Sequence, residues 1–273
     1  MPLSQRRLLS VVVLMLVALA SGPAAQEPAL TVEQMKAFLL KAKVVKSRVT
    51  PKGITSPSRL TLTDGTLTHD AAFQSVDEQA PRRDFADGTV EMNFVDSYRY
   101  DIAAYELATL LGLGDMMPVT VERIWNGKIG AISWWLPVVM DEETHLRKRL
   151  HPPDVNVWNR QMYKKRVFAE LTYDTDHNLT NVLISADWHL WMIDFSRAFR
   201  RSKDLHDARN IEQSMCSREL LERLRTLSSA DVQRVTGKHL TRYEVDAVMA
   251  RRDKIVAIYD ALIAKKGEKA VLF

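Results

Sequence analysis

The chain has 273 residues, of which 46% are hydrophobic and 26% are charged, so it is long enough to bury one sizeable core or two small lobes. The 38 Lys and Arg residues exceed the 34 Asp and Glu residues by four, and apart from short runs such as Arg147-Lys148-Arg149 the basic residues are scattered. This mild and scattered charge argues against a nucleic-acid partner.

The first residues have the order of a secretory leader. Arg6-Arg7 precedes an uncharged apolar stretch over residues 8–20, and small residues follow. This order predicts a signal peptide over residues 1–25 and an exported protein, periplasmic or secreted, with no stable membrane span after cleavage. The apolar stretch is short for a span, and an uncleaved anchor is the alternative. Cys216 is the only cysteine, so no intrachain disulfide can form.

The chain up to about residue 140 is mainly of β type. A capping box beginning at Thr31 predicts a short first helix. Alternating apolar runs joined at turn dipeptides then predict hairpins, with turns at Asp64-Gly65 and Asn126-Gly127. Between the hairpins, apolar residues at helical spacing predict one helix over 97–114, which ends in glycine.

The chain after Pro152-Pro153 is mainly of helical type. Asp154 is positioned to cap a helix that leads into residues 173–199. A second capping box begins at Thr241, and Gly267 is placed to end that helix. A β-rich half followed by an α-rich half predicts the α+β class.

The stretch YDTDHNLTNVLISADWHLWMIDFSRAF, residues 173–199, carries the strongest chemical signal. Asn181 follows Asp176 by five positions and Asp194 follows it by eighteen, with a short apolar hairpin in between. Phosphoryl transfer needs these residue types, because one carboxylate accepts the proton of the nucleophile while an amide oxygen and a second carboxylate hold Mg²⁺ against phosphates. Taken singly, the same residues are ordinary turn formers.

The order Asp176-His177-Asn178-Leu179-Thr180-Asn181 resembles the Asp-x-His-x-x-Asn motif of the atypical branch of the protein kinase-like fold, as in phosphoinositide kinases and secretory-pathway Golgi kinases. The histidine stands one place early, and Ser196 replaces the glycine of the Asp-Phe-Gly-type motif. The resemblance implies a bilobal fold. Residues 28–140 would form a small β-rich N-lobe that contains one helix, and residues 141–273 would form an α-rich C-lobe. It also implies Asp176 as the catalytic base, Asn181 and Asp194 as ligands of Mg²⁺ or Mn²⁺, and ATP or a related nucleotide as cofactor.

The resemblance assigns the nucleotide side of the site less completely. Gly53 lies where the phosphate-covering loop of the family would be, and Asp101 takes the place of the helix acid, with Glu106 as the alternative. Gln74 stands where the family has a lysine that pairs with the phosphates, so one positive charge is missing. Lys52, Arg59 and Arg197 are the candidates to supply it.

Three functions follow as hypotheses. The first is an exported kinase-like phosphotransferase whose acceptor is unknown and is a protein, a lipid or a small molecule. The second is a pseudokinase, a nucleotide-binding or regulatory module without phosphoryl transfer, which Gln74 favours. The third is an exported scaffold without a nucleotide site. Zinc is disfavoured because no close His-x-x-His or His-x-x-x-His spacing occurs, and a Ser-His-Asp hydrolase is disfavoured because no Gly-x-Ser-x-Gly elbow occurs.

Overall fold

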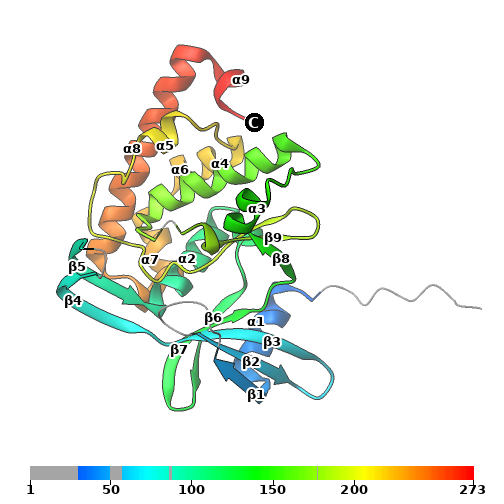
Figure 1. Cartoon of the computed structure of the whole chain (residues 1–273). Coiled ribbons are helices and arrows are strands. Elements are labelled where there is room, and N and C mark those ends of the chain that lie inside the picture. The colour runs from blue at the N-terminus through cyan, green and yellow to red at the C-terminus, as the bar shows by residue number, and fades with distance from the viewer. Residues whose placement is uncertain (1–29, 50–56, 86–87, 177) are drawn as a thin grey trace, which may run out of the picture. The chain divides into compact units, whose positions relative to one another are not determined.

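The computed structural model describes residues 30–49, 57–85, 88–176 and 178–273. The predicted signal peptide, Gly53 and His177 therefore lie outside the described residues. In the segment Thr31–Phe273, which forms one compact unit, antiparallel strands come first along the chain and most of the helices come afterwards (Figure 1). This order confirms the predicted α+β class, with a β-rich part followed by a helical part.

A five-stranded antiparallel sheet in the order β1-β2-β3-β7-β6 forms the first part. Its strands are β1 (Lys43–Val49), β2 (Ser58–Thr63), β3 (Thr68–Gln74), β6 (Thr120–Trp125) and β7 (Lys128–Trp134). The chain turns between β2 and β3 at Gly65, with φ of 98°, and between β6 and β7 at Asn126 and Gly127, with φ of 49° and 75°. Both predicted hairpins are confirmed by these strand pairings. The turns form at these residues because glycine and asparagine accept the positive φ that such turns require.

Helix α1 (Val32–Lys41) has the predicted capping box and packs beside β6 and β7. Its buried face includes Phe38 and Leu39. The guanidinium of Arg123, on β6, donates to the carbonyl of Leu39 at 2.6 Å and to that of Ala42 at 2.7 Å. These bonds satisfy carbonyls that the end of a helix leaves without an internal partner.

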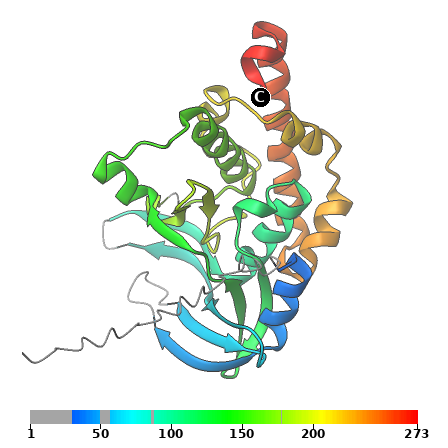
Figure 2. The ribbon, with the colours of Figure 1, turned by 90° about the vertical axis from the view of Figure 1, so that its right-hand side faces the viewer.

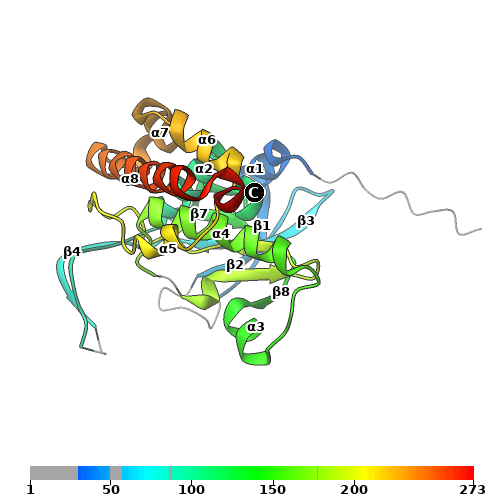
Figure 3. The ribbon, with the colours of Figure 1, turned by 90° about the horizontal axis from the view of Figure 1, so that it is seen from above.

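A second hairpin, β4 (Asp77–Asp84) and β5 (Val90–Ser97), was not among the predicted elements. It forms a separate two-stranded sheet that extends away from the five-stranded sheet in Figure 3. Most of its side chains are exposed or half-buried and many are charged. The alternation of apolar and polar residues that marks a half-buried strand is absent from β4, whereas β5 carries it over residues 90–94.

Helix α2 (Tyr98–Leu110) is the helix predicted between the strands. Ser97 Oγ accepts a hydrogen bond from the Arg99 N–H at 3.3 Å at its start, and Gly112 follows its end with φ of 74°. The helix contacts β6 and β7 on the sheet and α7 (Ser229–Thr236) in the helical part. It therefore joins the two parts through one core.

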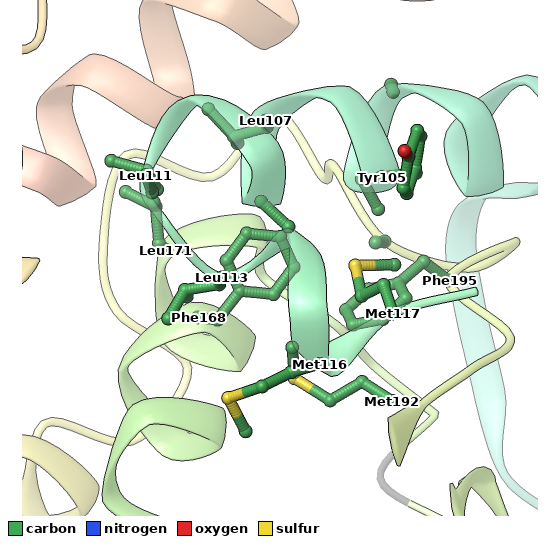
Figure 4. Packing of buried hydrophobic residues seen from close by; sticks show 14 of the residues in the cluster. Tyr105, Leu107, Leu111, Leu113, Met116, Met117, Phe168, Leu171, Met192 and Phe195 are labelled. Atoms are coloured by element: carbon green, nitrogen blue, oxygen red, sulfur yellow. The ribbon is translucent and has the colours of Figure 1, made fainter. Parts of the chain in front are cut away.

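Figure 4 shows this core at close range. Leu111 and Leu113, which follow α2, lie near Phe168 and Leu171 of the helical part, and each of the four is at most 2% exposed. Full burial of one such side chain stabilises the folded chain by about 1.5–3 kcal/mol. The core thus fixes α2 against the helix that leads into the candidate site.

The helical part contains α3 (Glu142–Lys148), α4 (Val155–Thr172), α5 (Arg209–Glu212), α6 (Arg218–Thr226), α7, α8 (Arg242–Lys266) and α9 (Glu268–Val271). Asp154 caps α4, a capping box begins α8, and Gly267 follows its end, all as predicted. The orange-red α8 runs beside the green α4 in Figure 2, in agreement with their contacts. Within the described ranges, no helix has the length and apolar character to cross a membrane.

A small antiparallel sheet in the order β10-β9-β8 lies at the junction of the two parts. Strand β8 (Val138–Asp141) spans the predicted lobe boundary at residue 140, and the hairpin of β9 (Val182–Ser185) and β10 (Leu190–Met192) is the one predicted between Asn181 and Asp194. This hairpin sets the spacing of the candidate site.

Candidate active site

The loop that carries Asp176, the predicted catalytic loop, begins where α4 ends. Tyr173 has φ of 50° and turns the chain out of the helix, and the Asp174 N–H donates to the Ala169 carbonyl at 3.1 Å. Asp174 Oδ1 then accepts the Asp176 N–H at 3.0 Å. The buried carboxylate of Asp174 therefore holds the backbone N–H of Asp176 in place.

Asp176 and Asn181 are joined through their own backbone. The Asp176 carbonyl accepts the Asn178 N–H at 2.7 Å and the Asn181 Nδ2 amide at 3.4 Å, the second at the long limit of a hydrogen bond. Asn181 ends a one-turn 3-10 helix over Leu179–Asn181, and its carbonyl accepts the Ile193 N–H at 3.1 Å. One hydrogen-bonded frame thus connects Asp176, Asn181 and the residue before Asp194.

Asp194 stands directly beyond β10 in a left-handed conformation with φ of 59°. Such a conformation is uncommon outside glycine, is tolerated by Asp, and is found preferentially at functional sites. The pKa of Asp194 is raised to about 6, chiefly by burial and also by the carboxylates of Asp176 and Asp96, while the Ser196 hydroxyl, 3.1 Å away, opposes the rise. A cation beside Asp194 would relieve this repulsion.

Asp101 faces the same segment from α2. Its Oδ1 accepts the Phe195 N–H at 2.7 Å. Burial, followed by the charge of Asp194, raises the pKa of Asp101 well above its ordinary value. The structure therefore places Asp101 against the backbone beside Asp194, whereas Glu106 forms an ion pair with Lys36 at 2.8 Å.

Gln74 ends β3, where it pairs with Ala131 of β7. Its side-chain Nε2 is buried and has no hydrogen-bond partner among the described residues. The neighbouring Gly130 is required by close packing, because a Cβ there would lie 2.3 Å from the Gln74 carbonyl oxygen. No contact between Gln74 and Asp101 is seen among the described atoms, so their pairing stays a prediction.

Two of the cations proposed to compensate for Gln74 have other partners. Arg59 forms an ion pair with Asp70 and lies over the Trp135 ring, 4.0 Å from its centroid. Arg197 forms an ion pair with Glu91. Lys52 lies outside the described residues.

Two residues of the site were not predicted. Asp96, at the end of β5, has a buried Oδ1 without a partner in the described chain, and burial raises its pKa, with Asp176 adding to the rise. Lys165, on α4, lines a small cavity of about 10 Å³ beside Asp174, Asp176 and Asn181, which is room for about one water molecule. Neither has a sequence signal, because Asp96 belongs to the unpredicted hairpin and Lys165 falls within an ordinary helical pattern.

A larger groove of about 930 Å³ opens next to this site. It lies between the β4–β5 hairpin and the segment after Asp194, and its lining includes Thr175, Arg197, Arg200 and Arg201. The Thr175 hydroxyl donates to the Arg197 carbonyl at 3.0 Å, so the groove reaches the residue before Asp176. Its charge is mainly positive, although Glu91 pairs with two of the arginines.

Carboxylates and histidines alone form no metal cluster here. Within the described residues, no group of three or more His, Cys, Asp or Glu side chains is arranged to hold a metal ion. Asn181 and Asp194 would supply one amide and one carboxylate. That number of protein ligands is typical of Mg²⁺ sites in which phosphates and water complete the shell.

Comparisons with solved structures identify the fold. A Fam20 protein from hydra, solved with sugar, has a TM-score of 0.65 at 14% identity over 89% of this chain and 92% of its own. The Golgi casein kinase has a TM-score of 0.62 at 12% identity over 88% and 77%. The proinflammatory kinase CtkA of Helicobacter pylori has a TM-score of 0.54 at 8% identity over 84% and 98%. No protein-family model and no curated protein matches the sequence.

The chain has an atypical protein kinase-like fold. At identities of 14% or less the likeness shows the fold and not the activity. The kinase-like fold confirms the resemblance that was inferred from the order of Asp176, Asn181 and Asp194. The roles of these residues, of Gln74 and of Asp101 stay predictions.

Proposed function

We propose that this kinase-like protein is a phosphotransferase that uses ATP or a related nucleotide with Mg²⁺ or Mn²⁺. The observation that carries the proposal is the hydrogen-bonded frame through Asp176, Asn181 and Ile193. It fixes the backbone of Asp176, the side-chain amide of Asn181 and the strand end that bears Asp194 relative to one another. Such fixed placement is the main contribution that a protein makes to phosphoryl transfer.

Each residue of the frame has a distinct role in the proposal. Asp176 accepts the proton of the acceptor hydroxyl. Asn181 and Asp194 hold the divalent cation, and the raised pKa of Asp194 fits a carboxylate that is completed by a cation. When bound, the cation neutralises charge on the phosphates. Asp101 holds the Phe195 backbone and so keeps Asp194 in place.

Gln74 supplies a neutral donor on the nucleotide side. Its Nε2 is buried without a partner among the described residues, and an unmade hydrogen bond of this kind costs about 1–3 kcal/mol. A phosphate oxygen would satisfy it. The position of Gly53 relative to the phosphates is a further part of the proposal.

The acceptor is proposed to enter through the groove beside Thr175. The groove is one residue from Asp176, and its lining carries Arg197, Arg200 and Arg201. Protein, lipid and small-molecule acceptors all fit the proposal.

The proposed location is outside the cytosol, in the periplasm or the medium. It rests on the leader-like order of residues 1–25, and one structural relative is described as a Golgi kinase. N-terminal sequencing of exported protein tests this location. We expect the N-terminus of the mature protein to lie between Ser21 and Glu27. An intact first residue would instead support an anchor or a cytosolic protein.

A pseudokinase is the second candidate, and the neutral Gln74 together with the engaged Arg59 and Arg197 favours it. The test is to measure ATP binding and ADP release with Mn²⁺ or Mg²⁺, alone and with a panel of protein, lipid and sugar acceptors. Turnover that Asp176→Asn abolishes supports the phosphotransferase. Binding without turnover supports the pseudokinase. The absence of binding contradicts the phosphotransferase and supports a regulatory module or a scaffold without a nucleotide site.

A further inference from the structure

Helix α4 presents a lysine to the cavity beside the proposed base. Lys165 lies about two turns before the end of α4 and lines the cavity with Asp174, Asp176 and Asn181. Ala169, one turn later on the same helix face, lines it too. The backbone that carries Lys165 is therefore part of the same rigid frame as the catalytic loop.

The Lys165 ammonium makes no hydrogen bond or ion pair with the residues that the structure describes. Burial lowers the pKa of Lys165, and the charge of Asp174 opposes this. Among the described residues, Lys165 is the only basic side chain that lines this cavity. Lys165 is half-buried, and an ammonium that makes no hydrogen bond within the described residues can donate to an anion.

The strand side of the site shows why such a cation is needed. Gln74 carries no charge, Arg59 pairs with Asp70 and Arg197 pairs with Glu91. A transferred phosphoryl group spreads negative charge over three oxygens, and kinase-like enzymes place positive charge around it. Lys165 lines the cavity beside Asp176 from the helical side.

We propose that Lys165 is a catalytic residue whose ammonium binds the oxygens of the phosphoryl group during transfer and replaces, from α4, the charge that Gln74 does not supply. This inference rests on the proposed phosphotransferase function. As the acceptor oxygen bonds to the γ-phosphorus, the bond from that phosphorus to the bridging oxygen breaks. The nucleoside diphosphate leaves with the bonding electron pair, the hydroxyl proton passes to Asp176, and Lys165 keeps its protons throughout.

A competing role for Lys165 is structural. Its ammonium would only balance the charge of Asp174, which in turn holds the Asp176 N–H. The two roles predict different effects of neutralising Asp174 in a protein that already lacks the Lys165 ammonium. A balancing charge becomes unnecessary when Asp174 is neutral, whereas a phosphoryl-binding charge stays necessary.

The test compares Lys165→Met with Lys164→Met, a change of the neighbouring lysine on the same helix. Turnover of ATP with Mn²⁺ is expected to fall about 10²–10³-fold in Lys165→Met, as for the loss of one group that stabilises transition-state charge. The preference of the wild type for adenylyl imidodiphosphate over ADP is expected to fall about tenfold, since only the first nucleotide carries a γ-phosphoryl group. Lys164→Met is expected to match the wild type, and Lys165→Arg to retain part of both properties because it keeps the charge.

The double variant Lys165→Met with Asp174→Asn separates the two roles and covers the case in which Lys165→Met does not fold. Recovery of thermal stability without recovery of turnover supports the proposal. Recovery of both, or an unchanged nucleotide preference and turnover in Lys165→Met, overturns it while leaving the phosphotransferase intact. A wild-type protein that binds neither nucleotide overturns the proposed function and this inference together.

Discussion

The two sides of the candidate site hold their polar groups in different ways. On the loop side, Asp176 and Asn181 are fixed by backbone hydrogen bonds that run from the end of α4 to β10. On the strand side, Gln74 and Asp96 each carry a buried polar atom that has no partner among the described residues. Because a buried group without a partner is costly, we expect a ligand to complete the strand side, whereas the backbone of the loop side already has its partners. The loop side fits the demands of chemistry, and the strand side fits those of nucleotide binding.

The largest expected effect is on the loop side. Asp176→Asn should lower turnover by about 10²–10⁴-fold, as for the loss of a general base, and leave nucleotide affinity unchanged. Steady-state turnover and equilibrium binding check this, with Asp187→Asn in the β9–β10 turn as a control that should behave like the wild type. Equal turnover in Asp176→Asn and the wild type would remove the loop side from the chemistry.

The next effect is a pH dependence of stability without metal or nucleotide. The folded pKa of Asp194, about 6, lies above its ordinary value of 3.8, so between these values the folded state holds more protons than the unfolded state. The stability contributed by this group is therefore present below about pH 4 and is lost as the pH rises through 6. A shift of about two pKa units corresponds to about 3 kcal/mol.

Urea unfolding of the wild type and Asp194→Asn at pH 4 and pH 7 measures this. The variant, which cannot ionise, should be the more stable protein at pH 7, by up to about 3 kcal/mol, and should lose that advantage at pH 4. A stability difference between the two proteins that does not change with pH would show that Asp194 has an ordinary pKa.

Metal binding should offset most of that difference in stability. With Mn²⁺ and ATP at about 100 times their dissociation constant, the wild type should gain about 2.7 kcal/mol. Asp194→Asn should gain little, because a neutral amide is a poor ligand for a hard dication. Thermal unfolding with and without Mn²⁺ reports this, and equal metal-dependent shifts in both proteins would remove Asp194 from the site.

The smallest effect is expected on the strand side. Gln74→Lys should tighten ATP binding by about tenfold, because it adds a charge-assisted bond to a phosphate, whereas Gln74→Met should weaken binding because it removes the buried donor. Combining Gln74→Lys with Asp101→Ala should reverse the gain if the two side chains meet. If neither Gln74 variant alters affinity, Gln74 does not face the phosphates.

The loop side was predictable from sequence because its signal is local. A short loop separates Asp176 from Asn181, and a hairpin of two short strands separates Asn181 from Asp194. The hydrogen bonds of this segment join residues that are close in the chain. The α+β order of strands, one inserted helix and later helices was predictable from periodicity and from cap and turn residues. The kinase-like fold was predicted by the resemblance of the Asp176–Asn181 motif.

The strand side was less predictable because its contacts are distant in sequence. Strand β4 lacks an alternation of apolar and polar residues, and the alternation of β5 over residues 90–94 ends before Asp96, so Asp96 itself carried no signal. Lys165, on the helical side, has the spacing of any lysine on a helix, and only the turn at Tyr173 after α4 brings Asp174 to the same cavity. Asp101 was placed near the site by resemblance, but its bond to the Phe195 N–H depends on packing between the two parts.

Calorimetric titration of ATP into the wild-type protein, with Mn²⁺ and then with a chelator in place of Mn²⁺, tests most directly the claim that Asp176, Asn181 and Asp194 frame a metal-dependent nucleotide site. The expected result is one binding site per chain in the presence of Mn²⁺, with an affinity that falls at least tenfold when the metal is removed. Equal affinity in the two titrations, or no binding in either, would contradict the account.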